Sequence, residues 1–371
     1  MKQVYIIDYI RTPIAKFQGG LSEVRADDLA AIVLKEIVKR NPQIPAEEIE
    51  DVILGCANQA GEDNRNVARM ASLLAELPIK IGGETVNRLC ASGMAAIANA
   101  YRAIAIGEGE IYLAGGVEQM TRAPYVLSKS AQPFGRDVQL FDSSFGWRFI
   151  NPKMKELYGV DGMGETAENL AEIYKISREA QDEFALLSQQ KAAAAQNSGR
   201  LAQEIVNVEI PQKKGEPKIF SEDEFVKPDT TLDKLAKLRP AFKKEGGSVT
   251  AGNSSGLNDG AAAMILASED AVKKYNLKPL AKIISSAVVG VEPRIMGIGP
   301  VEATKKALSR ANLSLEDMDI IELNEAFAAQ ALSVLQELGI DAKDERLNPN
   351  GGAIALGHPL GMSGTRIVGT A

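Results

Sequence analysis

Strand-like and helical patterns alternate along this chain, and that alternation limits the folds it can form. The first part alternates between short apolar runs typical of strands and apolar spacing typical of helices, at residues 4–7, 27–40, 51–55, 66–77, 85–86, 91–106 and 111–114. A repeated strand, helix, strand order predicts layers of helices packed on a sheet. We therefore expect an α/β protein.

A second run of the same kind begins near residue 247. It contains predicted strands at 262–267, 281–289 and 320–323 and predicted helices at 301–311 and about 325–338. Both runs lead into a glycine-containing turn before a helix rich in small residues, with Cys90-Ala-Ser-Gly93 in the first and Gly357-His-Pro-Leu-Gly361 in the second. This similarity suggests two related halves. By that symmetry further strands should follow Ala371, so we expect a truncated chain.

The region between these runs has a different character. Residues from about 117 to 246 carry many charges, proline-bearing loops and few strand-like runs, with one strong helical pattern at 176–198. We expect this region to be an insertion.

Composition excludes several classes of function. The 371 residues include 42 Lys+Arg and 49 Asp+Glu, which gives a net charge of −7, and the sequence has no basic block typical of nucleic-acid binding. One histidine and two separated cysteines do not make a structural zinc site, and we expect no metal. The apolar runs are too short for a membrane span. These features predict a cytoplasmic protein that binds neither nucleic acid nor membrane.

The sequence predicts different roles for the two cysteines. Cys90 precedes a small, apolar helix that we expect to be buried, and the positive end of a helix stabilises a thiolate nucleophile. A buried core cysteine is the alternative, although Gly93 would let a substrate approach the backbone. Cys56 follows an apolar strand, where a structural role is favoured.

His358, the only histidine, lies in a glycine-rich turn and is the one side chain that titrates near neutral pH when unperturbed. If the halves are related, His358 and Cys90 occupy equivalent positions and face each other. Asn324 sits at a strand-to-helix junction, where it could cap the helix or orient a water or carbonyl group.

Seven stretches of this sequence together resemble the thiolases, the acetyl-CoA C-acyltransferases, and the resemblance covers essentially the whole chain. They are Arg11-Thr-Pro, Asn87-Arg-Leu-Cys-Ala-Ser-Gly93, Gly115-Gly-Val-Glu118 with Ala123-Pro-Tyr125, Glu165-Thr-Ala-Glu-Asn169, Thr250-Ala-Gly-Asn-Ser-Ser-Gly-Leu-Asn-Asp-Gly260, Asn324-Glu-Ala-Phe-Ala328 and Asn348-Pro-Asn-Gly-Gly-Ala-Ile-Ala-Leu-Gly-His-Pro-Leu-Gly361.

The resemblance implies a thiolase-like five-layer α/β/α/β/α core of two homologous halves with an inserted loop domain. The N-terminal half would comprise residues 1–118 and 247–270, and the C-terminal half residues 271–371. The loop domain, 119–246, would bind coenzyme A (CoA). Thiolases are usually dimers or tetramers, so a homodimer or homotetramer is expected.

The resemblance also implies a reaction and its residues. Cys90 would attack the 3-keto carbon of a 3-oxoacyl-CoA, release acetyl-CoA and pass the acyl group to free CoA, which is a co-substrate rather than a bound cofactor. His358 would activate Cys90 and, with a water held by Asn324, bind the thioester oxygen of the departing acetyl-CoA. The implied substrate- and CoA-binding residues are Ser255, Ala251, Ser254, Phe242, Met163 and Phe327.

Three further stretches most resemble the branch of the family that acts on 3-oxoadipyl-CoA in aromatic-acid breakdown. They are Phe145-Gly-Trp-Arg-Phe-Ile-Asn-Pro152, Asp161-Gly-Met-Gly164 and Leu360-Gly-Met-Ser-Gly364. That substrate ends in a carboxylate, and Arg148 is a candidate to bind it, although a surface arginine is the commoner role.

One departure from the family favours reduced activity. Thiolases normally carry a second cysteine in a C-terminal Cys-x-Gly-Gly-Gly motif, which protonates the acetyl-CoA enolate, and this sequence lacks it. Cys56 lies in the wrong half to replace it, so we expect an impaired enzyme. Three alternatives stay open: an acetoacetyl-CoA thiolase, a condensing enzyme of the same superfamily, and an inactive CoA-binding fragment.

Overall fold

The computed structural model describes residues 1–371 and contains one mixed sheet of seven strands. Its strands are β1 (Val4–Arg11), β2 (Ala15–Lys16), β3 (Asp51–Gly55), β4 (Glu84–Val86), β5 (Ile111–Gln119), β10 (Asn258–Ser268) and β11 (Ala281–Lys282). The order is β11-β1-β10-β5-β3-β4, with β2 paired to β10. β3 is parallel to β4 and β5, whereas β10 is antiparallel to β1 and β5.

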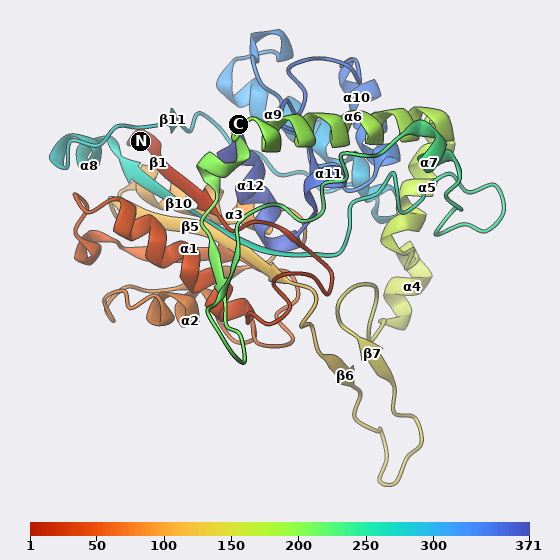
Figure 1. The fold of residues 1–371 in the computed structure, drawn as a ribbon, viewed down its shortest axis with the longest axis horizontal. Coiled ribbons are helices and arrows are strands. Elements are labelled where there is room, and N and C mark those ends of the chain that lie inside the picture. Colours follow the sequence, from red (N-terminus) through yellow and green to blue (C-terminus); the bar gives the residue numbers. More distant parts are fainter.

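Helices cover both faces of this sheet (Figure 1). The first face carries α1 (Ala26–Arg40) and α2 (Val67–Leu74), and the second carries α3 (Ser92–Ile106) and α12 (Leu360–Thr370). Alternate residues of β10 point to opposite faces of the sheet. Ala263 and Ile265 join the α1–α2 core, whereas Met264 and Leu266 join the α3 core. A strand buried on both faces is apolar without interruption, as the sequence from 261 to 267 is.

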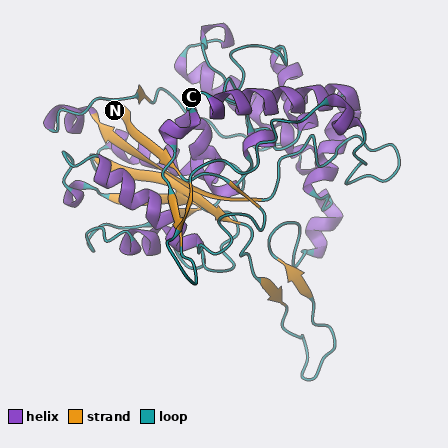
Figure 2. Ribbon diagram, in the orientation of Figure 1, coloured by secondary structure: helices purple, strands orange, loops and turns teal.

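A second group of helices lies beside the sheet. α6 (Arg178–Asn197), α10 (Ala328–Leu338) and α11 (Ala353–Leu356) share a smaller apolar core. The other helices are α4 (Pro152–Tyr158), α5 (Met163–Tyr174), α7 (Leu232–Ala236), α8 (Glu269–Lys274) and α9 (Gly299–Ala311). The expected insertion also forms two small ribbons, β6 (Tyr125–Leu127) with β7 (Leu140–Asp142) and β8 (Val208–Ile210) with β9 (Lys218–Phe220), and the β6–β7 hairpin projects away from the molecule (Figure 2).

The predicted strands of the second half are where the structure differs most from the sequence analysis. Only β11 forms within 281–289, and residues 320–323 contribute a single bridge between Ile321 and Leu347. A strand needs a hydrogen-bonded neighbour. No strand pairs with the chain beyond Lys282 or forms at 320–323, and Ile284 and Ile320 are exposed.

The helix that follows Cys90 is less buried than predicted. α3 packs on β5 and on α12, but Met94 in its first turn and Ile106 at its end remain exposed. By length and composition alone, residues 89–106 could cross a membrane, which is a weak signal that the core helices of globular proteins also give.

Candidate active site

Cys90 lies in a tight turn between β4 and α3. Asn87 Oδ1 accepts the Leu89 N–H at 2.9 Å, and Leu89 adopts a left-handed conformation with φ of 49°. Ser92 Oγ accepts the Arg88 N–H at 2.8 Å and donates to the Leu89 carbonyl at 2.6 Å. A branched side chain in a left-handed conformation is strained, and these bonds hold it in place. The turn therefore fixes the half-buried Cys90 at the start of α3.

Glycines let α3 and α12 cross at their first turns. A Cβ on Gly93 would lie 2.6 Å from Thr365 Oγ1 and 2.7 Å from the Gly361 carbonyl oxygen, and a Cβ on Gly364 would lie 2.2 Å from the Met94 nitrogen. Real side chains never approach so closely, so only glycine permits the crossing. The crossing brings together the starts of the two helices, which are preceded by Cys90 and by His358.

His358 is buried and held by three residues. Its backbone N–H donates to Asn258 Oδ1 at 2.9 Å. Ser363 Oγ donates its one hydrogen to the Pro359 carbonyl at 2.8 Å, so it accepts from His358 Nδ1–H at 2.6 Å. The Nε2 lone pair then accepts from Asn324 Nδ2 at 3.2 Å. His358 is therefore fixed as the Nδ1–H tautomer, with its basic nitrogen beside Asn324.

The helix-cap role weighed for Asn324 is wrong. The N-cap position of α10 is Phe327, three residues later, and Asn324 Oδ1 is buried without a partner. The following residue anchors the junction instead, because the Glu325 carboxylate accepts bonds from Ser188, Asn348 and the Ile354 N–H. Asn324 is thus held beside His358 with an unused acceptor.

The electrostatics of the pair differ from the sequence-based expectation. Burial raises the pKa of Cys90 to about 11, and the nearby charge of Glu118 adds to the effect, which opposes the thiolate expected at the helix N-terminus. Burial lowers the pKa of His358 to about 4, with a smaller contribution from Arg366. At neutral pH the two groups are a neutral thiol and a neutral imidazole.

Glu118 is a buried carboxylate that the sequence analysis quoted only as part of a motif. It accepts the N–H groups of Ala57 and Asn58 at 3.0 Å each and that of Gly361, in the first turn of α12, at 2.7 Å. Burial raises its pKa to about 7 despite these bonds. A carboxylate inside the fully buried strand β5 was the signal in the sequence, since such a group needs specific partners.

Cys56, Asp63 and Glu118 bring their side-chain ligand atoms within 4.8 Å of one another. Their lone pairs are already used, because Asp63 accepts from the N–H groups of Gln59 and Gly61 and from the Cys56 thiol at 3.4 Å. Burial and the two carboxylates raise the pKa of Cys56 well above its usual value. The donor set suits a protonated, structural thiol rather than a metal ion.

Four of the predicted binding residues lie close together. Ser255 donates through its N–H and its Oγ to the Ala326 carbonyl, at 3.0 Å each, and Ser254 forms a bridge with Phe327. The Phe327 ring meets the Phe242 ring edge-on at 5.9 Å. Phe242 in turn lies against Gly164 in the first turn of α5, which begins at the half-exposed Met163. Ala251 is exposed at the start of the same loop.

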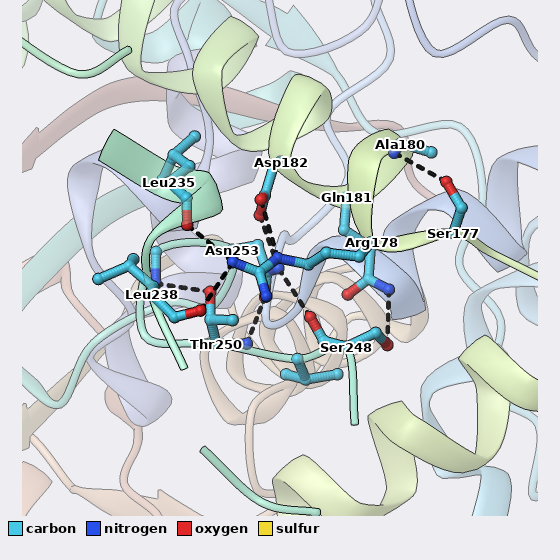
Figure 3. Close-up of polar contacts among 12 residues, drawn as sticks. Ser177, Arg178, Ala180, Gln181, Asp182, Leu235, Leu238, Ser248, Thr250 and Asn253 are labelled. Atoms are coloured by element: carbon cyan, nitrogen blue, oxygen red, sulfur yellow. Dashed lines mark hydrogen bonds and ion pairs between the residues drawn. The ribbon is translucent and has the colours of Figure 1, made fainter. Parts of the chain in front are cut away.

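A polar network fixes this loop to α6 (Figure 3). Asp182 accepts from Arg178 at 2.8 Å and from Asn253 Nδ2 at 3.0 Å, and Asn253 Oδ1 accepts the Thr250 N–H at 2.7 Å. Arg178 also donates to the Leu235 carbonyl at 2.7 Å. The loop that carries Ser254 and Ser255 is thereby bonded to α6 through Asn253 and to the Ala326 carbonyl through Ser255.

Comparisons with known proteins extend over the whole chain. The family model described as Thiolase, N-terminal domain matches residues 4–270, and that described as Thiolase, C-terminal domain matches residues 277–371. The chain is 59% identical to the "Beta-ketoadipyl-CoA thiolase" of Acinetobacter baylyi, over 100% of this chain and 92% of that protein. It is also 59% identical to the "3-oxoadipyl-CoA/3-oxo-5,6-dehydrosuberyl-CoA thiolase" of Escherichia coli, over 99% and 91%.

Solved structures agree with this fold. The acetyl-CoA acetyltransferase of Bacillus anthracis superimposes with a TM-score of 0.92 at 43% identity, over 100% of this chain and 91% of that one. The human mitochondrial 3-ketoacyl-CoA thiolase in complex with CoA gives 0.90 at 42% identity, over 100% and 90%. These comparisons confirm the predicted thiolase fold and give no support to the prediction of a truncated, impaired form. The chain belongs to the thiolase family.

Proposed function

We propose that this thiolase cleaves 3-oxoadipyl-CoA with CoA, yielding acetyl-CoA and succinyl-CoA, in the breakdown of aromatic acids. The observation that carries the chemistry is the crossing of α3 and α12, which joins the starts of the helices preceded by Cys90 and His358. The substrate is proposed because the chain shares 59% identity with relatives named for this acyl chain.

In the proposed reaction, Cys90 Sγ forms a bond to the 3-keto carbon while its proton passes to His358 Nε2. The bond between C2 and C3 of the substrate then breaks and acetyl-CoA leaves as an enolate, whose C2 takes up the equivalent of the proton held on His358 Nε2, so that His358 returns to its neutral form. The thiol of CoA then attacks the acyl-Cys90 thioester, its proton passes to the Cys90 sulfur, and Cys90 is released as a thiol. Asn324, beside His358, is proposed to hold a water that acts with His358 to bind the thioester oxygen of the departing acetyl-CoA, where negative charge develops.

CoA is proposed to act as co-substrate, with no tightly bound cofactor, and to lie across the loop domain, 119–246. Five residues support this site. Ser254 and Ser255 lie on one loop, Phe327 bridges to Ser254 and packs on Phe242, and Phe242 lies against the first turn of α5, which begins at Met163. Ala251 is proposed to contribute from the exposed end of the loop. We also propose a cytoplasmic homodimer or homotetramer, which light scattering would test.

The test is the mass of the intact protein after brief exposure to acetyl-CoA. We expect one added acetyl group that maps to Cys90, is retained by a Cys56→Ser variant and is lost in a Cys90→Ser variant. Wild-type protein should then cleave 3-oxoadipyl-CoA faster than acetoacetyl-CoA. CoA binding without any acetyl adduct would contradict the mechanism, and a preference for acetoacetyl-CoA would contradict the substrate.

A further inference from the structure

Arg148 differs from the other partly buried arginines of this chain. Seven arginines are not exposed: Arg11, Arg69, Arg148, Arg178, Arg200, Arg346 and Arg366. Five of them pair with a carboxylate, and Arg69 donates to two backbone carbonyls. Arg148 makes a single bond, from Nη2 to the neutral Asn58 Oδ1 at 3.0 Å. Its charge is therefore uncompensated, although a charge that is partly removed from water favours a counter-ion.

The partner of Arg148 belongs to the structure around the nucleophile. The peptide that joins Ala57 to Asn58 is held on both sides: the Ala57 carbonyl accepts from Asn87 Nδ2 at 2.9 Å, and the Asn58 N–H donates to Glu118. Asn87 begins the Cys90 turn, and Glu118 binds the first turn of α12. Arg148 therefore binds Asn58, whose peptide with Ala57 is hydrogen-bonded both to the Cys90 turn and to Glu118.

Trp147, the residue before Arg148, is hydrogen-bonded to the segment that leads into α5, at the proposed CoA site. Trp147 Nε1 donates to the Asp161 carbonyl at 3.1 Å, and the Asp161 carboxylate binds Asn169 and Arg294. Asp161 lies two residues before Met163, where α5 begins. The segment that carries Arg148 therefore runs between the Cys90 turn and the start of α5.

We propose that Arg148 binds the terminal carboxylate of a dicarboxylic 3-oxoacyl-CoA, an inference that rests on the proposed function. In the acyl-enzyme formed from 3-oxoadipyl-CoA, three C–C bonds of about 1.5 Å each separate the thioester carbon from the carboxylate carbon. The carboxylate must then be bound immediately beside the Cys90 turn. A guanidinium group matches a carboxylate with two parallel hydrogen bonds, and Asn58 holds this one without neutralising it.

The experiment compares two substrates that differ only in charge at the far end. Thiolysis of 3-oxoadipyl-CoA and of the uncharged 3-oxohexanoyl-CoA is measured for wild type, Arg148→Gln and Arg148→Lys. The matched control is Arg310→Gln, which removes from α9 an exposed arginine that has no carboxylate partner and donates to the neutral Ser286 carbonyl oxygen at 2.6 Å.

We expect Arg148→Gln to lower kcat/KM for 3-oxoadipyl-CoA by about 10- to 100-fold, mainly through KM, because a hydrogen-bonded charge is lost. The value for 3-oxohexanoyl-CoA should change by less than about threefold, Arg148→Lys should be intermediate, and Arg310→Gln should match wild type.

An equal loss for both substrates, or no loss for either, overturns the carboxylate site. An unfolded Arg148→Gln protein leaves the comparison to Arg148→Lys, which keeps the charge but not the two-bonded geometry. Failure of the proposed function is distinguishable, since wild type itself would then cleave 3-oxohexanoyl-CoA but not 3-oxoadipyl-CoA.

Discussion

Replacing Ser363 by alanine tests whether the tautomer of His358 is set by the hydrogen bond at Nδ1. Ser363 Oγ is the only acceptor for Nδ1–H, and the imidazole is 4% exposed, so water does not replace the lost partner. A buried N–H without a partner costs about 1–3 kcal/mol. The alternative tautomer, with its proton on Nε2, could instead donate to Asn324 Oδ1, which has no partner, after the amide turns over. In that state Nε2 cannot accept a proton from Cys90.

The size of the expected effect follows from this cost. Because each 1.4 kcal/mol changes a ratio tenfold, 1–3 kcal/mol shifts the tautomer ratio by about 5- to 150-fold. We expect Ser363→Ala to lower kcat within that range and to leave KM unchanged, since CoA-binding residues are not disturbed. Ser333→Ala is the matched control, because Ser333 Oγ is equally buried and donates to the carbonyl four residues earlier, but does not touch a histidine.

The single histidine makes the tautomer directly observable. In protein labelled with ¹⁵N at histidine, the NMR spectrum reports His358 alone, and the two ring nitrogens differ by protonation. We expect Nδ1–H in wild type and in Ser333→Ala, and a shift toward Nε2–H in Ser363→Ala. A wild-type spectrum with the proton on Nε2, or a Ser363→Ala enzyme as active as Ser333→Ala, would refute the reasoning.

Two further predictions concern the thiol and the helix crossing. In a Cys56→Ser background, alkylation of Cys90 by iodoacetamide should accelerate about tenfold per pH unit from pH 7 to 10, because the thiolate fraction rises until the pH reaches the raised pKa of about 11; a plateau below pH 9 would contradict that pKa. Gly93→Ala should lower the free energy of unfolding by about 1–3 kcal/mol and abolish acetylation of Cys90, because its Cβ lies 2.6 Å from Thr365 Oγ1. Gly299→Ala, with no atom closer than 3.8 Å, is the control for urea unfolding and should change stability by less than about 0.5 kcal/mol.

The helices and strands of the first half could be predicted from periodicity because the spacing of apolar residues within each one matches the face that it buries. The strand at Asp51–Gly55 has the predicted bounds, and the helix predicted at 27–40 begins one residue earlier, at Ala26. The strand predicted over 281–289 shortens to Ala281–Lys282. Apolar alternation identifies a segment that could join a sheet, but hydrogen bonding to a neighbour decides whether it does.

The candidate site was predictable where glycine-rich turns mark it, which is how Cys90 and His358 were found. Ser363 and Glu118 were present in quoted motifs, but their contacts join residues far apart in the sequence, such as Glu118 and Gly361. The sign of the Cys90 pKa shift was missed for the same reason. A helix N-terminus favours the thiolate locally, whereas burial and a carboxylate from another strand oppose it.

These two pKa values also restrict the order of events at the site. Cys90 at about 11 and His358 at about 4 differ by 11 − 4, or about 7 units. At 1.36 kcal/mol per unit, a thiolate–imidazolium pair lies about 10 kcal/mol above the neutral pair, before the attraction between the two charges is counted. A preformed ion pair is therefore rare in the resting protein. Proton transfer to His358 must accompany the attack of Cys90 on the 3-keto carbon, when negative charge moves from sulfur to the 3-keto oxygen. The alkylation profile of the free enzyme tests the raised pKa of Cys90 from which this order follows.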